Sequence, residues 1–373
     1  MSSQKLFTKS RFKIALDCPT KLYYASNDKI YANSNIDDPF LKALAKGGFQ
    51  VGALAQCYFP EGLEVKHRDY EKSVAETNEL LKKKNVTIFE AAIKFNNLFI
   101  RVDILQKIGK TINLIEVKSK SANPSEFYDE LWSKSEKKKG VYCLKSDWHS
   151  YIYDIAFQAY VTKKAFPGHI INSFLMCADK SKTASVDGLN QRFLLNDDGK
   201  NTEVILNGDV SQVALGDEIL CKLDVNEAVN VIHQDLEMSE RFGGLGFEKG
   251  IKFLADQFQN NSRVKPEVGK KCKGCEFRTN EPGKNSGFNE CWTLCHGMTL
   301  DELSRPFAFD VWNFKGSSKV LDAGKHLMEE LVDTDFSANL APSGLSIGQR
   351  QWLQVEKVIN DDSKSSKLPV WNS

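Results

Sequence analysis

The stretch that decides the fold runs from residue 98 to residue 118 and reads LFIRVDILQKIGKTINLIEVK. It holds two short runs rich in Ile, Val and Leu, which are separated by Lys107 to Lys110 with one glycine, a pattern typical of two strands and a turn. A third run, Thr87 to Ile93, comes before it and is separated from it by Asn96-Asn97. The sequence therefore predicts a three-stranded meander.

Helical periodicity predicts helices before and after the meander, and a further strand at about Ile170 to Ala178. The expected helices are Leu6 to Ser26 in two pieces broken at Cys18-Pro19, residues 38 to 58 interrupted by Gly47-Gly48, Tyr70 to Lys84, and about Ser150 to Lys164, Asn226 to Met238 and Phe247 to Phe258. Strands and helices in this order predict an α/β fold in which a mixed sheet lies between helices.

The last part of the chain predicts a helical extension or linker at residues 301 to 373, after a main domain at residues 1 to 300. Apolar residues from Val320 to Leu331 mark one face of a helix, and Ser346-x-x-Gln349 is a capping box that opens a last one. The tail from Asp361 is polar and is expected to be disordered.

Composition excludes several classes of protein. The 373 residues include 50 Lys and Arg against 49 Asp and Glu, so no global basic field is available to hold nucleic acid or a membrane, and such binding must be local. No apolar run is long enough to span a bilayer, and residues 1 to 13 do not resemble a signal peptide. Nine cysteines without an export signal indicate a reducing compartment, the cytoplasm.

The carboxylates in the meander indicate a site for a divalent metal ion. Residues two apart on a strand share a face, so Glu116 and Lys118 project together, and a hairpin through Gly109 brings Asp103 beside Glu116. Two close carboxylates in an apolar meander repel each other and are poorly hydrated, and a divalent cation is the usual way to offset that cost. Mg²⁺ prefers one or two carboxylates, with water and substrate oxygens in its other positions. The alternative is an amphipathic edge strand on which Glu116 and Lys118 face solvent and Asp103 is a salt-bridge partner.

Taken together, Asp103, Glu116-Val117-Lys118 and a following helix that carries Gln158 resemble the PD-(D/E)XK nuclease superfamily, specifically its RecB-like branch. The resemblance implies a restriction-endonuclease-like fold. It also implies that Asp103 and Glu116 are metal ligands, that Val117 offers its backbone carbonyl, that Lys118 is the catalytic lysine and that Gln158 supports the site. Such a site would hydrolyse phosphodiesters with Mg²⁺ or Mn²⁺.

Two positions depart from the RecB-like pattern. Gln56 stands where many of these nucleases carry a histidine, and Thr162 stands where a tyrosine usually follows the helix glutamine by four residues. We therefore consider Glu90 and Glu76 as sources of an additional metal ligand.

Four of the nine cysteines crowd together in the order C-x2-C-x15-C-x3-C, at Cys272, Cys275, Cys291 and Cys295. Residues 265 to 285 around the first two hold six Lys or Arg against three Glu. This spacing alone favours a zinc ribbon. An iron-sulfur cluster in which Cys18 joins three of these thiolates is the competing interpretation.

The segments around Cys18 and around Cys272, Cys275 and Cys291 resemble those of RecB-like nucleases that hold a [4Fe-4S] cluster, including the CRISPR-associated adaptation exonucleases and the AddB nuclease domain. The similarity spans residues 5 to 298 and is closest to uncharacterised RecB-like proteins. It implies that these four cysteines hold the cluster, whereas Zn²⁺ is the alternative metal that the spacing favours. The stretch between Cys275 and Cys291 is longer than in the adaptation nucleases, which leaves Cys295 as a substitute ligand. Such a cluster would close a loop of about 250 residues and stabilise the domain by removing unfolded-chain entropy.

The resemblance implies a metal-dependent DNA nuclease that acts on single-stranded DNA or DNA ends. The first alternative is a weakly active or inactive nucleic-acid-binding module with structural zinc, and the second is an enzyme that acts on another phosphoester. Local basic runs, at Lys82 to Lys84, Lys137 to Lys139 and the cysteine segment, are candidate phosphate contacts. The sequence has no P-loop motif, so we expect any helicase or further nuclease domain to be supplied elsewhere.

Overall fold

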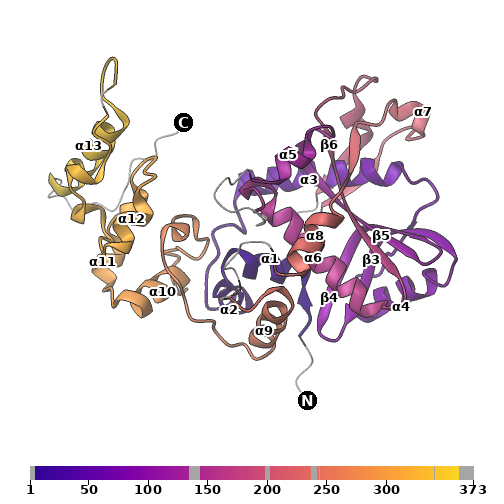
Figure 1. Ribbon diagram of the computed structural model, residues 1–373, viewed down its shortest axis with the longest axis horizontal. Helices are drawn as coiled ribbons and strands as arrows, with labels where there is room; N and C mark the ends of the chain where they lie inside the picture. Colours follow the sequence, from indigo (N-terminus) through magenta and orange to yellow (C-terminus); the bar gives the residue numbers. More distant parts are fainter. Residues whose placement is uncertain are drawn as a thin grey trace. The chain divides into compact units, whose positions relative to one another are not determined.

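The structure is a computed structural model that describes residues 5–133, 143–197, 202–236, 242, 244–339 and 341–360. The chain forms two compact units (Figure 1). The first unit comprises Met1–Leu22 and Asp37–Arg263, and the second comprises Tyr23–Ile36 and Val264–Ser373. Residues 264 to 300 therefore group with the helices that follow them rather than with the sheet.

A mixed seven-stranded sheet forms the centre of the first unit, in the order β2-β3-β4-β5-β6-β9, with β1 also paired to β4. The strands are β1 (Phe7–Thr8), β2 (Leu63–Glu64), β3 (Asn85–Phe95), β4 (Leu98–Ile108), β5 (Thr111–Ala122), β6 (Ile170–Asp179) and β9 (Leu220–Asp224), and β7 (Phe193–Asp197) and β8 (Thr202–Leu206) form a separate ribbon. Strands β3, β4 and β5 pair antiparallel, whereas β5 and β6 pair parallel. The predicted meander and the mixed sheet flanked by helices are confirmed.

Helices cover the sheet of the first unit. They are α1 (Lys9–Asp17), α3 (Pro39–Cys57), α4 (Tyr70–Leu80), α5 (Phe127–Leu131), α6 (Ser146–Ala165), α7 (Gln212–Leu215), α8 (Asn226–His233) and α9 (Phe247–Gln259), with a 3₁₀ turn η1 at Leu189–Arg192. Helix α6 connects β5 to β6, because two parallel neighbouring strands require a crossover (Figure 1). Its residues Ile152 and Ile155 are fully buried in one core cluster with Val102 and Leu114 of the sheet.

Alternation along β5 distributes its side chains between two cores. Ile115 joins Leu54 of α3 and Ile104 of β4 in a second cluster, whereas Leu114 belongs to the cluster that includes α6. Since successive strand residues point to opposite faces, Glu116 projects on the face of Leu114, toward α6. The strand therefore carries a carboxylate into an otherwise apolar layer.

Helix α3 is continuous, so the interruption expected at Gly47-Gly48 is wrong. Asp38 caps its N-terminus by accepting hydrogen bonds from the backbone N–H groups of Phe40 and Leu41, and Pro39 occupies the first turn. Glycine costs about 1 kcal/mol in a helix interior, which this capping and the contacts of the second half of the helix outweigh.

The single helix expected from Val320 to Leu331 is also wrong. Helix α12 (Ser317–Asp322) ends before Gly324, whose φ of 83° lies in the left-handed region and turns the chain. Its apolar residues are nonetheless buried in the core of the second unit. The apolar residues of α12 and of the segment after the turn are spaced in the sequence as on one helix face, although they belong to two short elements.

The second unit is made of short elements. They are η2 (Lys270–Gly274), α10 (Gly287–His296), α11 (Leu300–Ser304), η3 (Ala308–Asp310), α12, η4 (Met328–Glu330), η5 (Asp333–Asp335) and α13 (Ile347–Asn360), and α2 (Lys21–Ser26) ends within its N-terminal segment. The capping box at α13 is confirmed, since Ser346 and Gln349 exchange hydrogen bonds between side chain and backbone. The polar tail from Asp361 and the run Lys137 to Lys139 lie outside the described residues.

Candidate active site

The two meander carboxylates lie together, as predicted. Ile104 pairs with Ile115 across β4 and β5, so the antiparallel register sets Asp103 opposite Glu116. The backbone N–H of Val117 donates a hydrogen bond of 2.7 Å to Asp103 Oδ2. Glu116 is only 1% exposed, and β5 lies between β4 and β6. The alternative of a solvent-facing edge strand is therefore wrong.

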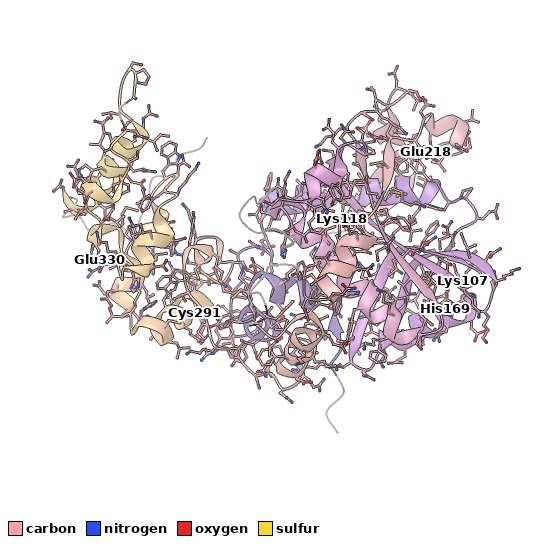
Figure 2. All side chains as sticks on the ribbon, in the orientation of Figure 1. Lys107, Lys118, His169, Glu218, Cys291 and Glu330 are labelled. Carbon is pink, nitrogen blue, oxygen red and sulfur yellow. The ribbon has the colours of Figure 1, made fainter. Side chains whose placement is uncertain are left out.

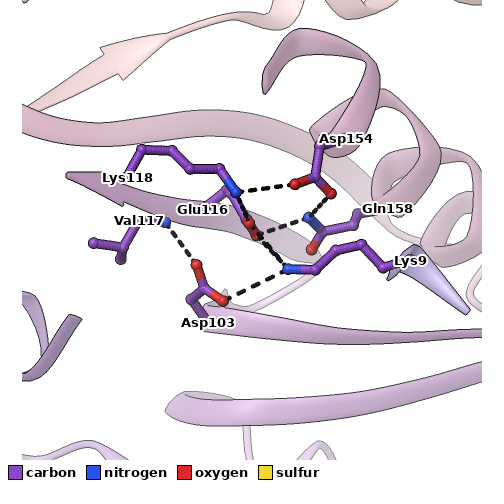
Figure 3. Close-up of polar contacts among 7 residues, drawn as sticks. All are labelled: Lys9, Asp103, Glu116, Val117, Lys118, Asp154 and Gln158. Carbon is purple, nitrogen blue, oxygen red and sulfur yellow. Dashed lines mark hydrogen bonds and ion pairs between the residues drawn. The ribbon is translucent and has the colours of Figure 1, made fainter. Parts of the chain in front are cut away.

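Lys118 reaches the carboxylates from the same face of β5 (Figure 3). Its Nζ donates to Glu116 Oε1 at 2.5 Å and to Asp154 Oδ2 of α6 at 2.9 Å. Lys118 belongs to the unit that contains the sheet (Figure 2). Its side chain is only 15% exposed. An ammonium group is thus fixed next to the predicted metal ligands.

Gln158 completes this arrangement from α6. Its Nε2 donates to Glu116 Oε2 at 2.8 Å and more weakly to Asp154 Oδ1 at 3.3 Å, so the predicted contact with the site is present. Its Oε1 is buried and accepts no hydrogen bond from any described residue. A buried acceptor of this kind is uncommon, and it leaves one oxygen available to a ligand.

Lys9 is the second cation of the site. It is the first residue of α1, and its Nζ lies 2.9 and 3.0 Å from the two carboxylate oxygens of Glu116 and 3.7 Å from Asp103 Oδ1 (Figure 3). The backbone there is held by β1, which pairs with β4, and by the rings of Phe7 and Phe12, which both contact Phe157 of α6. A lysine far from the meander in sequence thus lies between its carboxylates.

Burial, the neighbouring carboxylates and the two lysines together shift the pKa values of Asp103, Glu116 and Asp154. Burial and the charge of Glu116 raise the pKa of Asp103 to about 7. Burial opposes ionisation of Glu116 too, but the ammonium groups of Lys9 and Lys118 lower its pKa overall. Burial and Glu116 raise the pKa of Asp154. Strongly shifted carboxylates gathered around cations are a common property of catalytic sites.

Of the two candidates for an additional ligand, Glu90 lies near the site. It falls opposite Asp103 in the register of β3 and β4, and its φ of 54° is rare outside glycine. Burial raises its pKa, an effect that Lys9 partly offsets. Glu76 lies on α4 with a buried Oε2 that has no hydrogen-bond partner among the described residues, and no contact joins it to Asp103 or Glu116.

The two positions that depart from the RecB-like pattern contribute no contact to these carboxylates in the described structure. Thr162 donates its hydroxyl hydrogen bond to the backbone carbonyl of Gln158, one turn earlier in α6. Gln56 lies in the last turn of α3.

Sequence reasoning missed Lys9 and Asp154. Asp154 precedes Gln158 by four residues, so the helical spacing alone would have placed both on one face of α6. Nothing local marks Lys9, because only the pairing of Phe7 with Leu98 across β1 and β4 brings it to the site.

The donor set fits a hard divalent cation. In the described part of the chain no three His, Cys, Asp or Glu side chains form a metal site by themselves. Asp103 and Glu116 nevertheless already surround one cationic group, and two carboxylates are enough for Mg²⁺, which keeps several waters. The carbonyl oxygen of Gln158 adds an acceptor for such a water.

Of the clustered cysteines of the second unit, Cys272 lies in η2, Cys275 directly follows η2, and Cys291 and Cys295 lie in α10. Cys275 and Cys291, the latter labelled in Figure 2, both pack against the ring cluster of Tyr24, Tyr31 and Phe277. Cys291 Sγ lies 3.2 Å from the hydroxyl of Tyr24. Gly287 leaves room for that ring, because a Cβ there would lie 2.7 Å from Tyr24 Cδ2.

The remaining predicted thiols, Cys18, Cys272 and Cys295, have further neighbours in the described structure. Cys295 donates to the carbonyl of Pro266 at 3.4 Å, and Cys18 caps the end of α1 in the first unit. Cys272 packs against the aromatic core of the second unit.

Comparisons of the chain with protein-family models, curated proteins and solved structures found no match. Within the described ranges, no helix is both long and apolar enough to pass through a membrane.

Proposed function

We propose that this protein is a metal-dependent DNA nuclease of the PD-(D/E)XK type, with a restriction-endonuclease-like core that acts on single-stranded DNA or DNA ends. The observation that carries the proposal is that Asp103 and Glu116 lie together around the ammonium group of Lys9. Lys118 lies beside Glu116 on the same strand. Burying these charges costs several kcal/mol per ion, which even close pairing often fails to repay in full. Such a cluster of shifted carboxylates and lysines therefore favours a catalytic site over an inactive binding module.

Asp103 and Glu116 would hold Mg²⁺ or Mn²⁺, with the carbonyl of Val117 as a further oxygen ligand. When bound, the metal supplies Lewis-acid polarisation of the phosphate and a water of lowered pKa. Lys118 donates hydrogen bonds to oxygens that gain negative charge during hydrolysis. Glu116 and Asp154 hold its ammonium group in position, and Gln158 orients Glu116 through Nε2.

Cationic and aromatic groups next to the site are suited to a nucleic acid strand. Lys120 follows Lys118 on the same face of β5, and its Nζ lies 4.7 Å from the ring of Trp148 and 5.8 Å from that of Tyr151. Lysines beside a partly exposed ring such as Tyr151 can bind phosphates and stack bases without sequence preference, whereas Trp148 is buried and packs beneath Lys120. The earlier candidate Lys82 is less suited, because it forms an ion pair with Glu79 at 2.7 Å.

The proposal is tested with anaerobically purified protein and labelled DNA in linear and circular, single- and double-stranded forms. With Mn²⁺ we expect cleavage of single-stranded DNA or of DNA ends, which EDTA stops and Mg²⁺ restores. Cleavage that persists in excess EDTA would contradict the metal mechanism. Turnover of small phosphoesters without cleavage of DNA would favour an enzyme of another phosphoester class.

We also propose that the C-terminal thiols hold a metal centre, a [4Fe-4S] cluster with Cys18, Cys272, Cys275 and Cys291 as ligands. The packing of Cys275 and Cys291 on one aromatic cluster supports a centre that these two thiols share. Four thiolates also suit Zn²⁺, for which Cys295 is the competing fourth ligand.

Cys18→Ser and Cys295→Ser distinguish these two centres. We expect Cys18→Ser to lose brown colour, iron and several degrees of melting temperature in anaerobically purified protein, since metal binding contributes directly to folding. Cys295→Ser should change little. A colourless wild type that contains zinc, or an unaffected Cys18→Ser protein, would refute the cluster.

A further inference from the structure

Lys9 occupies the place between the two carboxylates of the candidate metal site. Its Nζ contacts both oxygens of Glu116 and lies 3.7 Å from Asp103, whereas Lys118 contacts Glu116 and Asp154. The two lysines therefore have different positions: Lys118 lies between strand and helix, and Lys9 lies between the two predicted ligands (Figure 3).

A divalent cation shared by Asp103 and Glu116 would compete with Lys9 for the same oxygens. Metal-oxygen distances of about 2.1 Å for Mg²⁺ are shorter than the 2.9 and 3.0 Å from Lys9 Nζ to Glu116, so the ion would lie within the present ammonium contacts. Two cations this close repel each other strongly, because both lie in a poorly hydrated layer. The four-carbon stem of Lys9 is flexible, so its ammonium group can move away from the carboxylates.

We propose that Lys9 is a displaceable counter-cation, which holds Asp103 and Glu116 in their ligand positions and leaves them when a divalent metal binds. This inference rests on the proposed function. It makes Lys9 a positioning residue of the site.

The first test measures Mn²⁺ affinity of wild type and Lys9→Gln by the electron paramagnetic resonance signal of free Mn²⁺. Binding that is lost in Asp103→Asn defines the site. Because the repulsion of a competing cation is removed, we expect Lys9→Gln to bind Mn²⁺ at least about tenfold more tightly. A merely structural role would have the opposite effect, since loss of a supporting contact weakens binding.

Two matched variants serve as controls for Lys9→Gln. Lys9→Arg keeps the charge and should not gain affinity. Lys5→Gln removes a nearby lysine whose Nζ lies over the ring of Phe258, 5.8 Å from its centre, and should bind Mn²⁺ like wild type.

A second test uses the wild-type chain, so it does not depend on the folding of a variant. Lysine acetylation is followed by mass spectrometry as Mn²⁺ is added. Lys9 should become more reactive as the site fills, while Lys13 of the same helix stays constant. Constant reactivity of Lys9 at saturating Mn²⁺ would overturn the inference.

The outcomes separate the inference from the proposed function. Wild-type protein that binds Mn²⁺ through Asp103, with no gain in Lys9→Gln, overturns the displacement alone. Absence of Mn²⁺ binding in both proteins overturns the proposed function and the displacement with it.

Discussion

Replacing Lys118 by methionine is expected to slow DNA cleavage by at least about 100-fold, the usual effect of removing one donor that stabilises transition-state charge. Methionine retains most of the volume of the side chain but has no ammonium group. Mn²⁺ binding should persist, since Asp103 and Glu116 are unchanged. The measurements are the single-turnover cleavage rate and the Mn²⁺ affinity of the same preparation.

A double variant controls for stability. Lys118→Met leaves Asp154 buried without the ammonium group 2.9 Å from its carboxylate, so the single variant should also lose melting temperature. Adding Asp154→Asn removes the unpaired charge and should restore much of the stability without restoring cleavage. Recovery of cleavage in the double variant, or a Lys118→Met rate within a few-fold of wild type, would show that the lysine has only a structural role.

Asp103→Asn is expected to abolish cleavage and specific Mn²⁺ binding while the protein stays folded. The amide oxygen can still accept the hydrogen bond from the backbone N–H of Val117, and asparagine resembles the protonated form of an aspartate whose pKa is about 7. It lacks the negative charge that a metal ligand supplies. Unchanged Mn²⁺ binding by this variant would remove Asp103 from the site.

The same variant has a predicted pH dependence without metal. An acid whose pKa is higher in the folded than in the unfolded chain binds its proton more tightly when folded, so its contribution to stability is full below pH about 4 and is lost as the pH rises to about 7. Asparagine does not titrate. The melting temperature of Asp103→Asn minus that of wild type, measured in EDTA, should therefore increase from pH 5 to pH 8. A constant difference would show that Asp103 ionises normally.

The local part of the fold could be predicted from the sequence. Strands β3 to β5 alternate or form short apolar runs between clear turn residues, and strand periodicity places Glu116 and Lys118 on one face. The hairpin register then follows from a short turn, which brings Asp103 to Glu116. These relations depend on neighbours in the sequence, so a pattern of residues is enough to find them.

Relations over long distances in the sequence could not be predicted. Strand β1 has only two residues, and its pairing with β4 depends on the burial of Phe7 among rings that come from α6 and α9. Lys9 reaches the carboxylates only through that pairing. Around Gly324 the sequence pattern predicted a helix that the structure does not have. The apolar residues on both sides of Gly324 are buried, but a turn at this glycine, not one continuous helix, brings them into the core.

Cleavage of labelled DNA by wild type and by Glu116→Gln, purified side by side, tests the central claim most directly. Glutamine keeps the size of the side chain and the acceptor for Lys118 but removes the charge that binds metal, and a contaminating nuclease would appear equally in both preparations. We predict cleavage by wild type only when Mn²⁺ or Mg²⁺ is present, and none above background by Glu116→Gln. Equal cleavage by the two proteins, or none by wild type on any DNA with either metal, would contradict the account.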